Sequence, residues 1–158
     1  MIGAAADKAW ASRRDARAGL DPDESARLSV LRQCAILDSP PEAIFDCIAR
    51  MAARLLATPI ALISLVDHER QWFKSCHGVE LHEALRAGSM CGLAVLGHGV
   101  LEIQDARVDP RFADSPLVTG PPHIRFYAGA PLTTEDGHNI GVLCVIDRTP
   151  RSLSAEQR

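Results

Sequence analysis

Several features that define whole classes of protein are missing from this sequence of 158 residues. No apolar run approaches the ~20 residues that cross a bilayer, and residues 1–20 lack the apolar region of a secretory signal. There is no basic run or aromatic ladder, and the net charge is -3, so nothing indicates binding to nucleic acid. We therefore expect a cytoplasmic chain that binds neither nucleic acid nor a membrane.

The cysteines and histidines also lack the spacings that mark a metal site or a disulfide framework. The five cysteines are odd in number and include no CxxC pair, which favours a reducing compartment. The six histidines include no pair spaced i, i+4 on one predicted helix, so no metal site is predicted. A glycine-rich phosphate loop is absent as well, and no Ser-His-Asp arrangement could be supported by spacing alone.

The most informative feature that is present is a predicted β-hairpin. Residues 124–132 and 140–147 read as two strands around a polar turn that carries Asp136-Gly137, a pair suited to positive φ. Residues 140–146 are apolar at nearly every position, as are residues 60–66. Strands that are apolar on both sides lie inside a covered sheet, so we expect these two strands to be neighbours at its centre.

Further elements are predicted on both sides of this hairpin. A helix is expected from Asp21 onward, with an apolar stripe through Leu28, Leu31, Cys34 and Ala35. A second helix, over residues 40–56, starts with a Ser39 cap signal. Its apolar stripe comprises Ile44, Phe45, Ile48, Met51, Ala52 and Leu55.

The middle of the chain is predicted to contain shorter elements. Strands are expected over residues 71–77 and 100–103, and a short helix from Ser89 to residue 96. Residues 78–88 read as a polar loop, and residues 105–123 as a long connection.

Hairpins dominate this order, which predicts an α+β fold with a central antiparallel sheet of five to six strands and helices on its faces. Numbered along the chain, the five predicted strands should lie in the order 2-1-5-4-3. One domain is expected over residues 21–158, after a flexible or helical leader over residues 1–20. Residues 154–158 read as the first turn of a C-terminal helix that the chain does not complete.

In this order and spacing, several segments resemble the GAF domain family, in particular members from bacterial sensor histidine kinases and cyclic-di-GMP signalling proteins. These segments are residues 37–42, 59–67, 70–75, 105–112 and 124–147. The resemblance implies a PAS-like, non-catalytic sensor domain that binds a small molecule between the sheet and the helix and loop above it.

The resemblance also implies partners within a larger signalling protein. An output domain, such as a histidine kinase or a cyclic-di-GMP enzyme, would follow the sensor. A homodimer through the terminal helices is also implied, with Leu28 and Leu31 as the candidate contacts. The resemblance names no cofactor, and the small molecule stays unidentified.

If a ligand binds, the strands and the short helix should hold it. The candidate ligand-binding residues are Ser64, Met90, Cys91, Asp105, Phe126 and Ala128. The connection over residues 105–123 is either a ligand lid or a local structure in which Asp109 caps a turn and Arg111 pairs with a carboxylate.

Cys91 supports an alternative, enzymatic hypothesis. It lies near the start of the short predicted helix, where a thiolate is favoured, and its Cys-Gly context is similar to that of free methionine-(R)-sulfoxide reductases, which share the GAF fold. Those enzymes need further cysteines, one of them in the loop that corresponds to residues 109–124 here, and no cysteine lies between Cys91 and Cys144. The other interpretation of Cys91 is a buried, unreactive thiol. A third hypothesis is a GAF domain that only dimerises, which a site packed shut by Phe126 and Met90 would favour.

Overall fold

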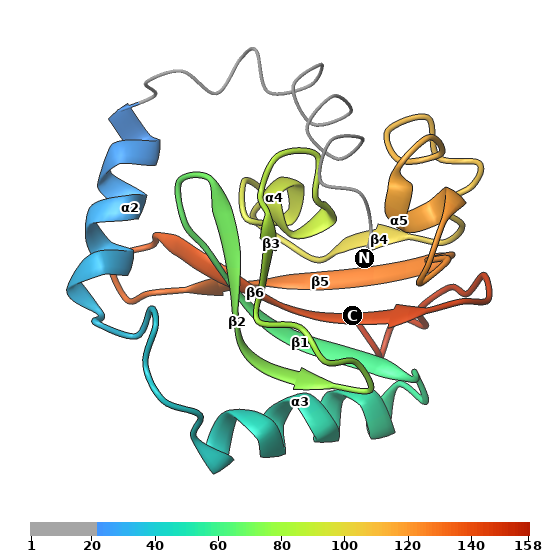
Figure 1. The fold of residues 1–158 in the computed structure, drawn as a ribbon, viewed down its shortest axis with the longest axis horizontal. Helices are drawn as coiled ribbons and strands as arrows, with labels where there is room; N and C mark the ends of the chain where they lie inside the picture. Colours follow the sequence, from blue (N-terminus) through green and yellow to red (C-terminus); the bar gives the residue numbers. More distant parts are fainter. Residues whose placement is uncertain (1–21) are drawn as a thin grey trace.

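A six-stranded antiparallel sheet forms the centre of the domain, with helices on both sides of it (Figure 1). This computed structural model describes residues 22–158, so the leader predicted over residues 1–20 and the Asp21 cap lie outside the described residues. The elements are α2 (Pro22–Gln33), α3 (Ala43–Leu55), β1 (Ile60–Val66), β2 (Arg70–His77), β3 (Glu83–Leu85), α4 (Met90–Ala94), β4 (Leu101–Ile103), α5 (Pro116–Thr119), β5 (Phe126–Thr133) and β6 (Asn139–Asp147).

The strands lie in the order β3-β2-β1-β6-β5-β4. The α+β class is therefore confirmed, and β1 and β6 are neighbours at the centre, with Leu62 opposite Cys144. The five predicted strands keep their predicted order, and β3 adds a sixth strand at the edge beside β2. The prediction of a loop over residues 78–88 was wrong at β3, because a strand of three residues is too short to show an alternating pattern.

One face of the sheet is covered by α4 and by the long connection that contains α5 (Figure 1). The connection contributes buried side chains to this core, so it is a packed part of the domain. Members of the core include Leu62, Met90, Cys91, Phe112, Val118, Tyr127, Val142 and Cys144.

The other face is covered by α3 (Figure 1). The side chains that α3 buries are small, namely Ala49 and Ala53, and they meet Ile63 and Phe126 from the strands. The larger residues of the predicted stripe point elsewhere: Ile44, Ile48, Met51 and Leu55 are exposed. The predicted period was correct, but the predicted buried side was wrong for these four residues, because small alanines let the helix lie close to the sheet.

The start of α3 also differs from the prediction. The helix begins at Ala43 with Glu42 as its N-cap, and no side chain makes the cap hydrogen bond. Ser39 instead accepts a hydrogen bond from Lys74 Nζ at 2.7 Å, and Lys74 Nζ also donates to the carbonyl of Pro40 at 2.8 Å. The buried Lys74 therefore fixes the connection between α2 and α3 to β2.

The helix α2 packs its leucines into the domain. Leu28 is 6% exposed and Leu31 is fully buried, so neither side chain is available for the dimer contact that was expected of it. Cys34 is exposed, Ala35 has a φ of 49°, and both follow the end of the helix. Among residues 22–158, no helix combines the length and apolarity needed to span a bilayer.

Candidate functional site

The structure brings together only half of the candidate residues. Ser64 lies on the face of the sheet that α4 covers, and Met90 and Cys91 face it from α4. Phe126 and Ala128 lie on the opposite face, against α3. These two groups therefore cannot line one ligand site, because the sheet separates them. On β5 it is Tyr127 that points toward Cys91, since neighbouring side chains of a strand face opposite sides.

Asp105 lies apart from both groups and is held by Arg125. Arg125 donates two hydrogen bonds to its carboxylate, at 2.7 and 2.6 Å, and the backbone N–H of Arg107 donates a third at 3.1 Å. The hydrogen bonds from Arg125 lower the pKa of Asp105 to about 2. Asp109 similarly accepts from the backbone and the guanidinium of Arg111. Both carboxylates fix local turns of the connection, which supports the local-structure interpretation of this segment over the lid.

Two buried thiols and a phenol meet under α4. The Sγ atoms of Cys91 and Cys144 lie 3.7 Å apart, although 53 residues separate them in the chain. The hydroxyl of Tyr127 donates to Cys91 Sγ at 3.4 Å. This group, Cys91, Cys144 and Tyr127, is called the thiol cluster below.

The local sequence around Cys91 explains how α4 presents it. Ser89 is the N-cap of α4, and its Oγ accepts a hydrogen bond from the backbone N–H of Gly92 at 2.8 Å. A Cβ at Gly92 would lie 2.7 Å from the carbonyl oxygen of Arg86. Glycine at this position therefore lets the helix start against the preceding turn, with Cys91 facing the sheet.

Gly129 has an equivalent role for Tyr127. The two residues lie on the same side of β5, and a Cβ at Gly129 would lie 2.3 Å from the Tyr127 hydroxyl. The phenol ring thus runs over Gly129 and carries its hydroxyl to Cys91. The Tyr127-Ala128-Gly129 segment of the hairpin therefore places the Tyr127 hydroxyl beside the Cys91 thiol.

The contacts within the thiol cluster shift the pKa values of the two cysteines in opposite directions. The hydrogen bond with Cys144, aided by that from Tyr127, lowers the pKa of Cys91 against the opposing effect of burial. The same contact with Cys91, together with burial, raises the pKa of Cys144. Burial raises the pKa of Tyr127 as well. Between the two buried thiols, these contacts therefore favour a thiolate at Cys91 over one at Cys144.

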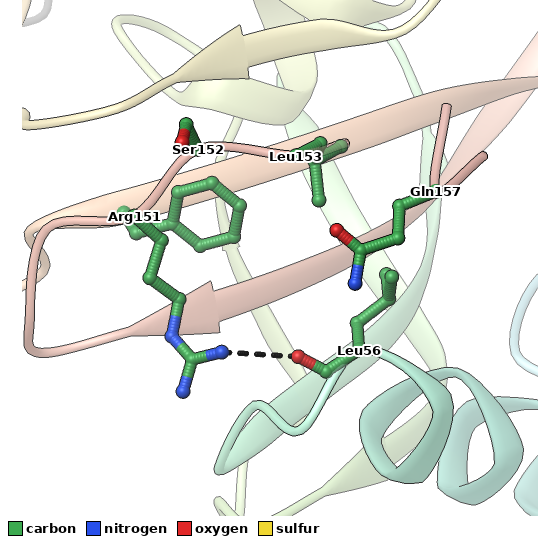
Figure 2. A pocket seen from close by; sticks show the side chains of 6 residues that line it. Leu56, Arg151, Ser152, Leu153 and Gln157 are labelled. Atoms are coloured by element: carbon green, nitrogen blue, oxygen red, sulfur yellow. Dashed lines mark hydrogen bonds between the residues drawn. The ribbon is translucent and has the colours of Figure 1, made fainter. Parts of the chain in front are cut away.

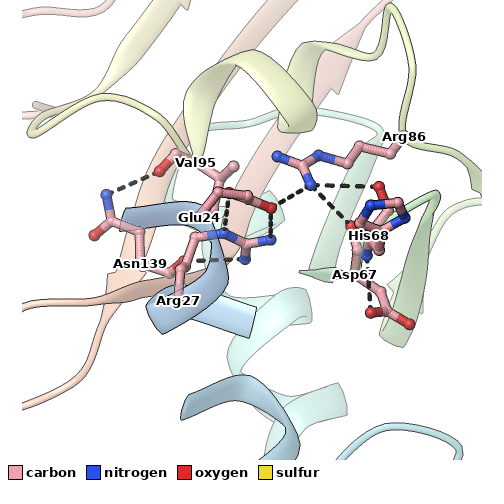
Figure 3. A network of polar contacts seen from close by, with 7 residues as sticks. All are labelled: Glu24, Arg27, Asp67, His68, Arg86, Val95 and Asn139. Carbon is pink, nitrogen blue, oxygen red and sulfur yellow. Dashed lines mark hydrogen bonds and ion pairs between the residues drawn. The ribbon is translucent and has the colours of Figure 1, made fainter. Parts of the chain in front are cut away.

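The end of α4 is fixed to the sheet by one side chain. Asn139, at the start of β6, donates from Nδ2 to the carbonyls of Val95 at 3.0 Å and Gly97 at 2.7 Å. The backbone carbonyl of Asn139 accepts a hydrogen bond from the guanidinium of Arg27, on α2, at 3.3 Å. Figure 3 shows how this contact continues through Glu24, which Arg27 and Arg86 both approach. The helices α2 and α4 thus meet through one polar network.

Two hollows open away from the thiol cluster. One, of about 200 Å³, lies beside α3 and is lined by Leu56, Phe126, Arg151, Ser152, Leu153 and Gln157. Figure 2 shows that Arg151 spans it to donate to the carbonyl of Leu56 at 3.0 Å. The other, of about 360 Å³, is lined by residues from the end of α4 to the start of β4, with Arg111 beside them. Phe126 therefore borders the hollow beside α3.

Among the described residues, no group of three or more His, Cys, Asp or Glu side chains gathers as a metal site would require.

The fold and this arrangement can be compared with known proteins. The GAF domain family matches residues 40–158. The chain belongs to the GAF domain family.

A curated relative of this GAF domain is a cyclic di-GMP phosphodiesterase of Pseudomonas aeruginosa, 48% identical over 135 residues. The match covers 85% of this chain and 23% of the relative, so the GAF domain spans less than a quarter of the relative's length. That protein is therefore much longer, and the activity in its name belongs to the whole of it.

Solved structures share the fold at low sequence identity. The GAF domain of a phosphoenolpyruvate-protein phosphotransferase from Acinetobacter has a TM-score of 0.60 and 16% identity, and the match covers 87% of this chain and 85% of that one. A free methionine-R-sulfoxide reductase from Neisseria meningitidis, solved with its substrate, has a TM-score of 0.59 and 17% identity, with 88% and 83% covered. At such identities these likenesses establish the fold alone.

Sequence reasoning misses two members of the thiol cluster. Cys144 lies far from Cys91 in the sequence, yet the two side chains are in contact. Tyr127 is absent from the predicted site, which contains its neighbours Phe126 and Ala128 instead. The available signal is Gly129, because a glycine two residues after an aromatic residue in a buried strand leaves room for the ring to lie along the strand.

Proposed function

We propose that this chain is the regulatory input domain of a cyclic-di-GMP signalling protein and does not itself hydrolyse the nucleotide. The observation that carries the proposal is the 48% identity with a segment of a cyclic di-GMP phosphodiesterase that is only 23% of that protein. A segment of this size with a GAF fold fits a role in control better than a role in the chemistry of the whole protein.

The proposed mechanism is a shift in population between two positions of α4. Met90 and Tyr127 fill the space between α4 and the sheet, and both are buried. A small molecule that bound there would have to bind a state in which α4 has moved outward, and it would shift the population toward that state. The network from Asn139 through Arg27 offers a route by which such a movement reaches α2.

A segment exchange tests this proposal. In the Pseudomonas phosphodiesterase, the matching segment would be replaced by this chain or deleted, and cyclic-di-GMP hydrolysis would be measured for both proteins and for the isolated chain. We expect no hydrolysis by the isolated chain, activity in the exchanged protein, and a several-fold altered rate after deletion. Hydrolysis by the isolated chain, or an unchanged rate after deletion, would contradict the proposal.

Native mass spectrometry addresses the small molecule directly. The chain would be purified from its own host and sprayed under gentle conditions. A bound species that disappears after α4 is loosened by Asn139→Ala supports binding under α4. A bound species that is retained in this variant contradicts that location.

A second candidate function is a thiol enzyme that reduces free methionine sulfoxide. The observation that favours it is the contact between Cys91 and Cys144, which places a second thiol beside the first, although not in the segment over residues 109–124. Turnover of free methionine-(R)-sulfoxide with a thiol reductant, abolished in Cys91→Ser, would support this function. Absence of turnover would dismiss it.

The resemblance implied a homodimer. Because Leu28 and Leu31 are buried, we propose that its contact surface is on α3. Ile44, Ile48, Met51 and Leu55 are spaced i, i+4, i+7 and i+11 along one exposed side of the helix, with Leu55 76% exposed. Such a seam is self-complementary, since two copies can pair the same residues about a two-fold axis. We propose a second copy of this chain as its occupant.

Sedimentation of the paired variant Ile48→Lys, Met51→Lys tests this contact. We expect the wild-type chain to dimerise and the variant to be monomeric, with Leu81→Lys, at an exposed leucine outside α3, behaving as wild type. A monomeric wild-type chain at high concentration would overturn the dimer.

A further inference from the structure

The thiol cluster is not required by the proposed regulatory function, and it places two sulfurs in contact. Of the five cysteines, Cys34 is exposed, and Cys47 and Cys76 are partly exposed. Cys91 and Cys144 alone are buried, and their Sγ atoms lie 3.7 Å apart on two different elements, α4 and β6. A disulfide needs an S–S distance of about 2.0 Å, so a small inward movement of α4 would bring the sulfurs to bonding distance.

We propose that Cys91 and Cys144 form a redox-active pair that a hydroperoxide converts into a disulfide, which fixes α4 to the sheet. This modification site is independent of the proposed function, because it depends on the two thiols and not on any output domain.

The reaction balances with a hydroperoxide as the only oxidant. The Cys91 thiolate attacks the outer oxygen of the peroxide, the O–O bond breaks, and the alcohol or water leaves after taking up a proton. Cys91 is then a sulfenic acid. The sulfur of Cys144 attacks the Cys91 sulfur, the S–O bond breaks, and hydroxide leaves as water with the Cys144 proton. Two thiols and one hydroperoxide thus give one disulfide, one alcohol or water, and one further water.

The surroundings of the two sulfurs assign these roles. Tyr127 donates its hydroxyl hydrogen bond to Cys91 and thereby stabilises the thiolate that attacks. Cys91 is 5% exposed and Cys144 is 1% exposed, so the peroxide reaches Cys91 first. Cys91 also belongs to a helix of only five residues, and an element with so few internal hydrogen bonds opens at low free-energy cost. Tyr127 is a positioning residue in this step.

The disulfide would complete a double attachment of α4 to β6. The end of α4 already accepts two hydrogen bonds from Asn139 at the start of β6. The proposed bond attaches its beginning to Cys144 in the middle of the same strand. Because Asn139 also contacts Arg27 of α2 (Figure 3), the oxidised domain would hold α2, α4 and β6 as one rigid unit.

Peptide mapping of the complete chain tests the proposal. The reduced chain would be treated with one equivalent of hydrogen peroxide, its remaining thiols blocked with N-ethylmaleimide under denaturing conditions, and the product digested without reductant. We expect loss of two of the five free thiols, a mass decrease of two hydrogens before blocking, and one cross-linked peptide that contains Cys91 and Cys144. An upward shift of the melting temperature should accompany the bond.

Variants provide matched controls. Cys91→Ser and Cys144→Ser should each lose the cross-link, and Cys34→Ser should keep it. Tyr127→Phe retains both thiols and should slow the oxidation several-fold. Circular dichroism establishes that each variant is folded, and the wild-type map needs no variant at all.

Three results would overturn the proposal. The first is a wild-type chain that keeps all five thiols under peroxide. The second is a chain in which Cys91 stops at the sulfinic acid without a cross-link. The third is a cross-link that joins any other pair of cysteines. An unchanged oxidation rate in Tyr127→Phe would remove the role assigned to the tyrosine.

Discussion

The two faces of the central sheet are built in different ways. On one face, α3 has thirteen residues and lies against the strands through alanines. It is also fixed by Ser75, which donates to Asp46 at 2.6 Å. On the other face, α4 has only five residues, and larger side chains, two thiols and a phenol fill the space beneath it. Under the proposed function, the α3 face has a structural role and the α4 face a regulatory one.

The difference follows from how helices are stabilised. A helix of thirteen residues satisfies most of its own backbone groups, and close contact with the sheet immobilises it. A helix of five residues satisfies few, so α4 depends on the Ser89 cap at its start and on Asn139 at its end. Short elements held by a few side-chain contacts are the ones that open locally. Changes on the two faces should therefore have different consequences.

The largest effect on stability is expected from Gly129→Ala on the α4 face. The new Cβ would lie 2.3 Å from the Tyr127 hydroxyl, and the ring belongs to a side chain that is only 1% exposed. We expect a loss of about 3 kcal/mol in the free energy of unfolding, measured by urea denaturation. Gly99→Ala is the control, because no described residue other than Gly99 and its two chain neighbours has an atom within 4 Å of the place that its new Cβ would occupy. Equal stability of the two variants would contradict the path of the ring over Gly129.

On the α3 face, Ala53→Leu should cost about 2 kcal/mol, because the added methyl groups have to enter the close contact between helix and sheet. Leu55→Ala, two residues along the same helix, should change the unfolding free energy by less than about 0.5 kcal/mol, since Leu55 is exposed. Denaturation of both variants at low protein concentration checks this. The reverse order would mean that the large residues of α3 are the ones that face the sheet.

Asn139→Ala should have a moderate and local effect. It removes two hydrogen bonds to the end of α4 and leaves the carbonyls of Val95 and Gly97 without this partner, at a cost of about 1.5 kcal/mol. Amide hydrogen exchange should accelerate in residues 90–97 and remain unchanged in α3. Gln104→Ala, at an exposed side chain, is the control. Equal acceleration in both helices would remove the distinction between the two faces.

The smallest effect on the free energy of unfolding is expected when the pH is lowered and Glu24 becomes protonated. Burial favours the neutral form of Glu24, but hydrogen bonds from Arg27 and Arg86 outweigh it and lower the pKa to about 2. A carboxyl with a lowered pKa stabilises the fold above its unfolded pKa, near 4.5, and this contribution is lost as the pH falls toward 2. Since solvent screens these charges, we expect a contribution of about 1 kcal/mol.

Glu24→Gln isolates that contribution. Between pH 5 and pH 2, the urea midpoint of the variant should fall less steeply than that of the wild-type chain. Asp105→Asn should behave similarly, because the pKa of Asp105 is also lowered to about 2. Parallel midpoint curves for the wild type and both variants would contradict the assigned ion pairs.

The strands of the sheet were predictable from the sequence. The face of the sheet toward which each side chain points was not. In β5 both faces of the strand are covered, so Phe126, Tyr127 and Ala128 are all buried and no alternation separates the two faces. In α3 the buried residues are small and the exposed ones are large, so hydrophobicity selects the wrong side. These choices depend on packing distances, which local patterns do not contain.

The prediction of the candidate site was limited for the same reason, because local sequence patterns do not show which distant residues are in contact. The contact between Cys91 and Cys144 joins residues that are 53 positions apart, and no spacing rule connects a helix start with the middle of a distant strand. The Ser89 cap, by contrast, was predictable because it is local: its partner Gly92 is three residues away. Asp105 lies in a turn, where a carboxylate can either stabilise the turn or bind a ligand. The sequence does not distinguish these two roles.

The most direct test of the difference between the two faces is amide hydrogen exchange of the reduced and the peroxide-treated chain, followed by mass spectrometry. In the reduced chain, the amides of α4 should exchange faster than those of α3. Oxidation should slow exchange in residues 90–97 and 139–147 and leave α3 unchanged. Unaltered exchange of α4 after oxidation, or an equal change in both helices, would contradict the assignment of the regulatory role to the α4 face.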